Sequence, residues 1–318
     1  MYRIGVDLGG TKIQTVVVNK KSEVKGQDRR ETPRSGGPKD VTKTIADSVK
    51  AAIKDAGKPL DKILGIGVGG PGQIDARAGT LSNAGNLPGW KLTYPLGTEL
   101  SKRVKLPVDL GNDVQVAVRG EAELGAGRPY NSFLGLWPGT GVGGGIVIQR
   151  KMWLGRGAAG EIGHTVINAV NGPPCSCGHF GCVEAYAGRG SMTERANLLV
   201  AQGHHTRLFE IQQEKGKDRL TSGVWAKAIK EKDKMAMELL DRAIWALGQG
   251  AGSAVNLLDV DAVIIGGGLG VRFGQDFADR IGREAHTRLL RPDKAPDFVV
   301  AELGDLGGAI GAALLPLD

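Results

Sequence analysis

The chain is poor in several residue types on which common classes of protein depend. Phe, Trp and Tyr together make up 5% of its 318 residues, too few for the aromatic surface that stacks the bases of single-stranded nucleic acid. No run of about six like charges is present, as a DNA-binding tail would need. The net charge of +7 fits either a solvated surface with extra Lys and Arg or attraction to an anion. We therefore expect no nucleic-acid partner.

Long hydrophobic segments are also missing. No apolar run is long enough to span a bilayer. The opening MYRIGVDLGG enters a strand pattern without the charged and apolar regions of a secretory signal. Cysteine is scarce, and three residues at metal-binding spacing fit a reducing compartment. We expect no membrane association and a cytoplasmic location.

Glycine, in contrast, is abundant, with 51 residues, many of them clustered. The length is about twice that of a usual domain, which favours two domains that share a cleft. Strand patterns at Tyr2–Asp7 and Ile13–Val18 flank one Gly-rich turn, and those at Phe133–Trp137 and Ile146–Gln149 flank another. Because further α/β elements follow each hairpin, the pattern predicts a duplicated α/β fold with its boundary near Asp113–Gly127.

All three cysteines lie in one short segment. Cys175, Cys177 and Cys182, together with His164 upstream, form the ligand set of a closed tetrahedral zinc site. Cysteines can also be small buried hydrophobes, but this Gly- and Pro-rich segment does not suit a core helix. Two carboxylates, Glu161 and Glu184, flank the segment. A metal that holds these carboxylates near each other suggests a site for a hydroxyl-rich molecule.

The first Gly-rich turn combines glycines with polar side chains. Backbone N–H groups of Gly9 and Gly10 can converge on phosphate oxygens, while Thr11 adds a hydroxyl and Lys12 a cation. Asp7, at the end of the strand, could hold hydrated Mg²⁺. The alternative is an ordinary Gly-Gly hairpin, which rarely needs Asp, Thr and Lys together.

A second and a third Gly-rich segment are less specific. The second turn predicts another phosphate cradle, formed by Gly139, Thr140, Gly141, Gly143 and Gly144. The third, around Gly267 and Gly268, fits close approach of a nucleotide ribose or base, or a plain tight turn. It does not complete the GxGxxG fingerprint of a dinucleotide-binding oxidoreductase.

Two polar segments suit either the binding and reaction of a hydroxyl-rich molecule or a simpler structural role. Asp113, at the end of a short strand, could accept a proton from an attacking hydroxyl, or it could be the N-cap of the helix that follows. The loop Ser82–Trp90 contains Asn86, whose amide suits vicinal hydroxyls, although an ordinary surface loop remains the alternative.

Taken in order, these motifs resemble the ROK family of repressors, ORFs and kinases over nearly the whole chain. The motifs are DLGGTK, GGPGQID, NLPGW, ND, GTGVGGG, EIGH and CSCGHFGCVEAY. One departure from the family pattern is Ser176, where Gly is common. The resemblance implies a two-lobed actin-like ATPase fold, with duplicated RNase H-like lobes and an active-site cleft between them. We expect residues 1–117 plus 305–318 to form the small lobe, and residues 118–304, with the zinc-binding segment 164–182, to form the large lobe.

The resemblance also implies roles for individual residues. Asp113 would be the general base, and the two Gly-rich turns would hold ATP with Mg²⁺. His164 would serve both the structural zinc and the sugar. The groups that would contact the sugar are Gly72, Asn86, Asn112, Asp113, Glu161, His164 and Glu184.

The implied activity is that of a glucokinase, which transfers phosphate from ATP to the 6-hydroxyl of glucose, in a homodimer. The alternatives are a kinase for N-acetylglucosamine, N-acetylmannosamine, fructose or mannose, and a sugar-sensing regulator without turnover. Because the motif DLGGTK begins at Asp7, we expect no helix-turn-helix of a ROK repressor ahead of it.

Overall fold

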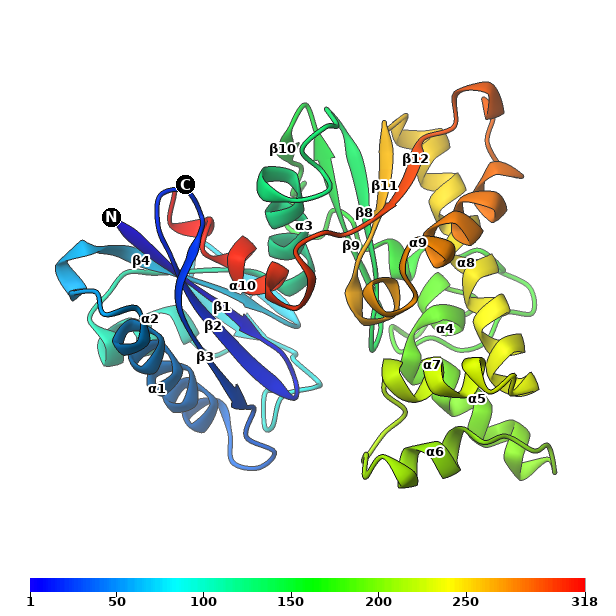
Figure 1. The fold of residues 1–318 in the computed structure, drawn as a ribbon, viewed down its shortest axis with the longest axis horizontal. Coiled ribbons are helices and arrows are strands. Elements are labelled where there is room, and N and C mark those ends of the chain that lie inside the picture. Colours follow the sequence, from blue (N-terminus) through cyan, green and yellow to red (C-terminus); the bar gives the residue numbers. More distant parts are fainter. Residues whose placement is uncertain (318) are drawn as a thin grey trace. The chain divides into compact units, whose positions relative to one another are not determined.

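A computed structural model describes residues 1–317 and divides into two compact units. The first unit contains Met1–Arg128, Gly155–Gly157 and the C-terminal segment from Glu302. The second contains Pro129–Leu154 and Ala158–Ala301. Figure 1 shows a separate sheet in each unit.

The first unit is built on a five-stranded sheet in the order β3-β2-β1-β4-β7. Its strands are β1 (Tyr2–Leu8), β2 (Lys12–Val18), β3 (Val24–Glu31), β4 (Ile63–Gly70) and β7 (Val108–Asn112). β1, β2 and β3 are successively antiparallel, whereas β4 is parallel to both β1 and β7. The unit also contains the hairpin β5 (Gln73–Asp75) and β6 (Thr80–Ser82), helices α1 (Pro38–Ala56), α2 (Leu96–Val104), α3 (Asp113–Leu124) and α10 (Gly307–Ala312), and 3-10 turns η1 (Leu60–Lys62), η4 (Gly304–Leu306) and η5 (Leu315–Leu317).

The second unit has a five-stranded sheet in the order β10-β9-β8-β11-β12. Its strands are β8 (Phe133–Pro138), β9 (Val142–Ile148), β10 (Lys151–Met152), β11 (Ala262–Ile265) and β12 (Asp297–Val300). Its helices are α4 (Val183–Ala187), α5 (Arg189–Ala201), α6 (Leu208–Glu214), α7 (Ser222–Lys230), α8 (Lys234–Leu258) and α9 (Gly267–His286), with 3-10 turns η2 (Ile162–His164) and η3 (Pro292–Lys294).

The two sheets share one topology. In each, a three-stranded antiparallel meander is extended by two parallel strands that pair with the first strand of the meander and then with each other. The sequence predicted a duplicated α/β fold from the two Gly-rich hairpins, and the matching strand order confirms it.

The alternation of side chains along β2 explains how helices cover both faces of the first sheet. Val17 belongs to the buried cluster that contains Val41 of α1, while Val16 and Val18 belong to the cluster that contains Ala309 of α10. Successive strand residues point to opposite faces, so α1 and α10 lie on opposite sides of the sheet. The close approach of α10 requires glycine, because a Cβ at Gly5 would overlap the carbonyl oxygen of Ala309.

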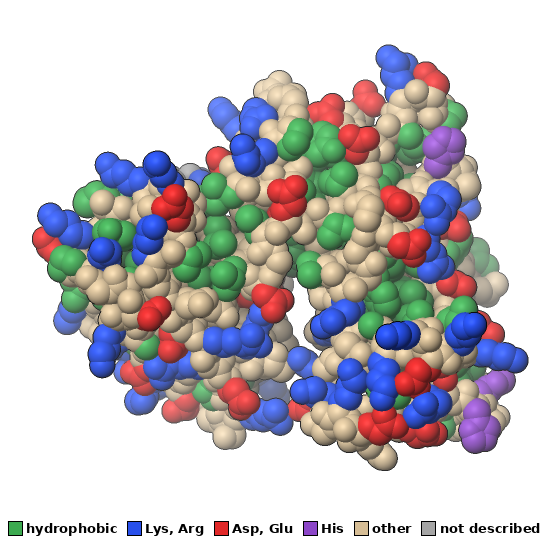
Figure 2. All heavy atoms as spheres, viewed as in Figure 1, with side chains coloured by type: hydrophobic (Ala, Val, Ile, Leu, Met, Phe, Trp, Pro, Cys, Tyr) green, Lys and Arg blue, Asp and Glu red, His purple; other side chains and the backbone are tan. Residues whose placement is uncertain are grey.

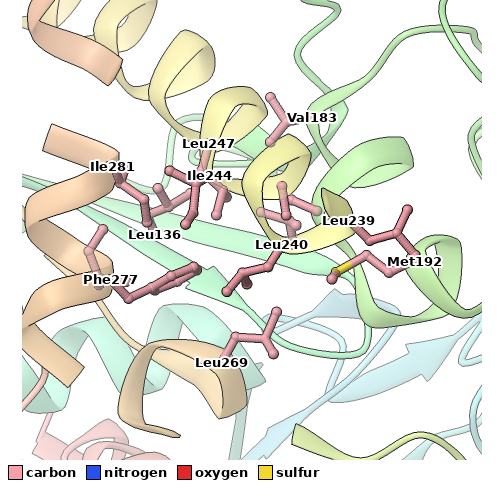
Figure 3. Close-up of a cluster of buried hydrophobic side chains, with 14 of the residues drawn as sticks. Leu136, Val183, Met192, Leu239, Leu240, Ile244, Leu247, Leu269, Phe277 and Ile281 are labelled. Carbon is pink, nitrogen blue, oxygen red and sulfur yellow. The ribbon is translucent and has the colours of Figure 1, made fainter. Parts of the chain in front are cut away.

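The core of the second unit forms where α8 and α9 pack against the sheet. Figure 3 shows Ile244 and Leu247 of α8 and Phe277 of α9 beside Leu136 of β8. The buried residues of α8 recur at helical spacing. Together, α8 and α9 hold β8 and β11, from whose ends the two Gly-rich segments of this unit begin.

Several elements differ from the sequence-based expectation. β9 begins at Val142, so Gly143 and Gly144 are strand residues rather than turn residues. The polar stretch before Thr221 contains α6, which the sequence analysis did not predict. Gly188 separates α4 from α5, so that Arg189 becomes the first residue of a new helix.

The charged surface is mixed. Figure 2 shows Lys and Arg side chains interspersed with Asp and Glu on the visible face. Within residues 1–317, no helix combines the length and apolar character that crossing a membrane requires.

Candidate functional site

In the first unit, Asp7 and Lys12 bracket the turn between β1 and β2. The turn is closed by a 2.9 Å hydrogen bond from the backbone N–H of Gly9 to the carbonyl of Lys12. Burial raises the pKa of Asp7 to about 6, with a further increase from nearby Asp113 and a smaller opposing effect from Lys12. Three residues that the sequence predicted as site residues, Asp7, Asp113 and Lys12, therefore lie close enough to influence one another's charge.

Asp113 reaches this environment because β1 and β7 both run parallel to β4. Parallel strands end at the same edge of a sheet, so Asp7 near the end of β1 and Asp113 just after β7 lie at that edge. Two carboxylates that share an edge disfavour each other's charge. This arrangement can both attract a hydrated cation and offer a proton acceptor.

The structure corrects one interpretation of Asp113. The N-cap of α3 is Asn112, whose Oδ1 accepts hydrogen bonds from the N–H groups of Val114 at 3.0 Å and Gln115 at 3.1 Å. Asp113 is the first helical residue, and its Oδ1 accepts from Val114 N–H at 2.9 Å. Asn112 therefore fulfils the capping role that the sequence analysis offered for Asp113.

The predicted sugar loop lies next to the first turn. A Cβ at Gly10 would be 2.8 Å from the carbonyl oxygen of Asn86, so the two segments are in close contact. Asn86 itself is exposed. The indole of Trp90, in contrast, is buried and donates to the carbonyl of Leu81 at 3.0 Å. Trp90 therefore fixes the loop and leaves the exposed amide of Asn86 available to a ligand.

Gly72 lies between β4 and the hairpin formed by β5 and β6. Its φ of 82° is in the left-handed region, and a Cβ there would be 2.6 Å from the carbonyl oxygen of Ser82. Only glycine fits this conformation without strain. The backbone of Gly72 is therefore held against the start of the loop that carries Asn86.

In the second unit, the turn from β8 to β9 is tied to Glu184. The N–H of Gly139 donates to the carbonyl of Gly141 at 2.8 Å, and the N–H of Val142 donates to Glu184 Oε2 at 2.8 Å. The other carboxylate oxygen of Glu184 accepts from the hydroxyl of Ser176 at 2.8 Å. Because each carboxylate oxygen can accept more than one hydrogen bond, Glu184 can still accept one from a ligand hydroxyl.

Gly267 and Gly268 belong to the first turn of α9 rather than to a separate turn. Gly267 has a φ of 68°, and a Cβ there would be 2.6 Å from the carbonyl oxygen of Pro138. The structure thus places the third Gly-rich segment against the end of β8, where the second begins at Gly139. The oxidoreductase fingerprint remains incomplete.

The predicted metal ligands do come together. The ligand atoms of His164, Cys175, Cys177 and Cys182 all lie within 4.8 Å of one another. Cys177 Sγ is 3.7 Å from Cys182 Sγ, and Cys175 Sγ is 3.7 Å from His164 Nδ1. All three cysteines are free thiols. Four such donors at these separations can hold a metal ion, and the Nε2 of His164 remains for a second interaction.

The backbone around these four residues forms a compact loop held by its own hydrogen bonds. The N–H of Cys175 donates to the carbonyl of His179 at 2.8 Å, and the N–H of Val183 donates to the carbonyl of Thr165 at 3.0 Å. Glu161 is exposed and directly precedes η2, which carries His164. The compact loop therefore fixes His164 before the cysteines and Glu184 after them.

Some neighbours of the site were not found from the sequence. His179 has its Nδ1 3.4 Å from Cys177 Sγ. Asp305 is close enough to raise the pKa of Asp7. Arg189 donates to Thr140 in the second turn. His179 lies within the motif CSCGHFGCVEAY, two residues from Cys177, whereas Asp305 and Arg189 belong to none of the motifs, so only the fold reveals them.

Several known proteins are similar to this chain over nearly its whole length. A glucokinase from Halalkalibacterium halodurans is 32% identical over 316 residues, which cover 99% of this chain and 94% of that protein. An N-acetyl-D-glucosamine kinase from Pectobacterium atrosepticum is 33% identical over 325 residues, covering 98% of each chain. The crystal structure of a ROK family glucokinase from Streptomyces griseus, in complex with glucose and AMPPNP, matches with a TM-score of 0.81 at 29% identity over 98% of each chain. The sequence model of the ROK family matches residues 3–318, and the chain therefore belongs to the ROK family, as its motifs predicted.

Proposed function

We propose that this protein is a sugar kinase that transfers the γ-phosphoryl group of ATP to the 6-hydroxyl of glucose. The observation that carries the proposal is the pairing of Asp113 with Asp7 at one sheet edge, beside a Gly-rich turn that contains Lys12. A phosphoryl transfer needs a proton acceptor for the attacking hydroxyl and positive groups around the phosphates. The first unit offers both.

In this mechanism, Asp113 accepts the proton of the sugar hydroxyl as that oxygen attacks the γ-phosphorus. Mg²⁺ bound with ATP would neutralise the charge that develops on the phosphate oxygens. Asp7 would hold the hydrated ion, and its raised pKa fits a carboxyl that a cation would keep ionised. Lys12, Thr11 and the N–H groups of Gly9 and Gly10 would bind phosphate oxygens.

The second unit would supply the other phosphate cradle and much of the sugar recognition. The cradle would use Gly139, Thr140 and Gly141 in the turn, with Gly143 and Gly144 behind it, and Gly267 and Gly268 would approach the nucleoside. Sugar hydroxyls would be bound by Glu161, His164 and Glu184, while the first unit would add Gly72, Asn86 and Asn112. The half-buried position of His164 and Glu184 supports this role, because partial exclusion of water strengthens hydrogen bonds to hydroxyls.

The metal held by the Cys/His cluster would be structural zinc. Sulfur atoms bound to one tetrahedral zinc ion at about 2.3 Å lie about 3.8 Å apart, and Cys177 Sγ and Cys182 Sγ are 3.7 Å apart. Four protein ligands leave no open position for a substrate. The zinc would therefore act by orienting His164, whose Nε2 could meet a sugar hydroxyl.

Glucose is favoured because relatives that carry the name glucokinase match nearly the full chain. The N-acetyl-D-glucosamine kinase relative supports the alternative of an N-acetylated hexose. The phosphate-binding turns cannot separate these substrates, because they do not contact the sugar. We also propose a homodimer, as the family resemblance implies.

The test is ADP release, measured with purified protein, ATP and Mg²⁺ across glucose, mannose, fructose, N-acetylglucosamine and N-acetylmannosamine. We expect the highest kcat/KM with glucose. Preference for an N-acetylated hexose would replace glucose as the substrate while keeping the kinase function. Sugar binding without ADP release from any of the five would instead support a sugar-sensing regulator.

A further inference from the structure

A half-buried arginine, Arg189, lies beside the second Gly-rich turn and has no acidic partner among residues 1–317. Arg189 is the first residue of α5. Its Nη2 donates to Thr140 Oγ1 at 3.0 Å, and its Nη1 donates to Ser222 Oγ at 2.7 Å. Within residues 1–317, no hydrogen bond or ion pair joins its guanidinium to a carboxylate. Such a cation, held only by neutral hydroxyls, is suited to bind an anion from outside the protein.

Three segments that are distant in the sequence converge on this guanidinium. Thr140 comes from the turn between β8 and β9, and Ser222 is the first residue of α7. Gly268 in the first turn of α9 completes the arrangement, since a Cβ there would be 3.0 Å from Ser222 Oγ and 3.3 Å from Arg189 Nη1. The group therefore lies between the two Gly-rich segments that we assign to the nucleotide.

The backbone fixes the position of Arg189 as well. Its N–H donates to the carbonyl of Gly139 at 3.1 Å, and the N–H of Gly190 donates to the carbonyl of Thr140 at 3.0 Å. The start of α5 is thus joined directly to the turn. A ligand bound in the turn would meet the guanidinium without a large movement of the chain.

The surroundings of Arg189 disfavour its positive charge. Burial lowers the pKa of its guanidinium, and the nearby charge of Arg219 lowers it further. An arginine still remains protonated in such a place. A bound anion would offset both the lost hydration and the repulsion between the two guanidinium groups.

The guanidinium of Arg189 and the two hydroxyls that it contacts can form more hydrogen bonds than they form within the protein. A guanidinium has five N–H donors in a planar fork that matches a phosphate group, and two of its nitrogens are engaged here. The hydroxyls of Thr140 and Ser222 accept from Arg189, so each can donate its own proton to an anion. We propose that Arg189, together with Thr140 and Ser222, binds a phosphate group of the nucleoside triphosphate.

This inference rests on the proposed kinase function, and its test is designed to separate the two. Arg189→Gln removes the charge while keeping a polar side chain of moderate length. Because a hydrogen bond to a charged group contributes about 1.5–3 kcal/mol, we expect KM for ATP to rise about 10- to 100-fold. The sugar KM should stay within about twofold of that of the unaltered protein. Arg195→Gln is the matched control, since Arg195 is an exposed residue of the same helix.

The measurement is steady-state ADP release with ATP and sugar varied in turn, together with the melting temperature of each variant. Arg189→Lys should raise KM for ATP less than Arg189→Gln does, because it keeps the charge but loses the fork. An unchanged KM for ATP in Arg189→Gln would overturn the proposal. So would a parallel rise of both KM values with a lower melting temperature, which is the signature of a structural brace. Absence of activity in the unaltered protein would contradict the kinase function itself.

Discussion

The two Gly-rich hairpin turns occupy equivalent places in two sheets of the same topology, yet they carry different chemistry. The turn between β1 and β2 brings its own charged residues, Asp7 and Lys12. The turn between β8 and β9 has no charged residue, and its charged neighbours Glu184 and Arg189 come from later helices. The two turns thus share their place in the topology and their glycines, while their charged neighbours come from different parts of the chain. We infer that the first turn serves the chemical step and the second mainly serves binding.

The largest effect should come from Asp113, the proposed base next to the first turn. Asp113→Asn should lower kcat by about 10²–10⁴ because the amide cannot accept the proton of the sugar hydroxyl. Sugar binding, measured by calorimetry, should change little. Asp109→Asn is the control, because Asp109 is an exposed residue of the same strand, β7. Near-normal turnover in Asp113→Asn would contradict the proposal that the first unit supplies the general base.

The metal cluster offers a test of the binding role of the second unit. Cys177→Ser removes one of the four clustered ligands. We expect weaker zinc retention and a sugar KM higher by about 10- to 100-fold, because the metal orients His164. Metal content by atomic absorption and sugar KM should change together. Unaltered sugar affinity in zinc-free protein would show that the cluster stabilises the segment without shaping the sugar site.

The hairpins and the cluster of metal ligands are the features that could be predicted from the sequence. The hairpins were predictable because β-branched runs on either side of clustered glycines have few other solutions. The metal cluster was predictable because Cys175, Cys177 and Cys182 are close in sequence, so a short loop is enough to bring them together. In both cases the residues that define the feature are neighbours along the chain.

Features that depend on distant contacts could not be predicted in the same way. Arg189 meets Thr140 and Ser222 only after two helices, α5 and α7, have packed against the hairpin of β8 and β9, and a single arginine carries no local signal. The N-cap of α3 was offered as one of two roles for Asp113, whereas Asn112 fulfils it. Both residue types cap helices, and only the backbone geometry distinguishes them. Helix α6 was missed because its seven residues are too few to show a clear apolar period.

The raised pKa of Asp7, next to the first turn, predicts that the free energy of unfolding depends on pH. Between its ordinary value of 3.8 and about 6, the folded protein keeps a proton that the unfolded chain has released. The free energy of unfolding therefore falls as pH rises through this range. Asp7→Asn should remove that loss and stabilise the metal-free protein at pH 7 by on the order of 1–3 kcal/mol.

This prediction is measured by urea denaturation of the variant and the unaltered protein at pH 4 and pH 7. The difference between the two proteins should be small at pH 4 and larger at pH 7. Asp109→Asn again serves as the control and should show no such change between the two conditions. A constant difference at both values of pH would mean that Asp7 is ionised to the same extent in the folded and unfolded states. Since Asp7 is also the proposed magnesium-holding residue, the more stable variant should be the less active one, as expected where activity requires a destabilising charge.

The smallest effect concerns Ser176, at which this chain differs from the common glycine of the family. Its hydroxyl donates to Glu184 Oε1 at 2.8 Å, while Glu184 Oε2 accepts from the backbone of the second turn. Ser176→Gly should leave the metal content and kcat unchanged but raise the sugar KM about two- to fivefold, since solvent limits an exposed interaction with a charged group to about 1 kcal/mol or less. Ser176→Thr keeps the hydroxyl and should stay closer to the unaltered protein. A change in KM for ATP with no change in sugar KM would reverse the assignment, because it would show that Glu184 acts on the phosphate turn through Val142 rather than on the sugar.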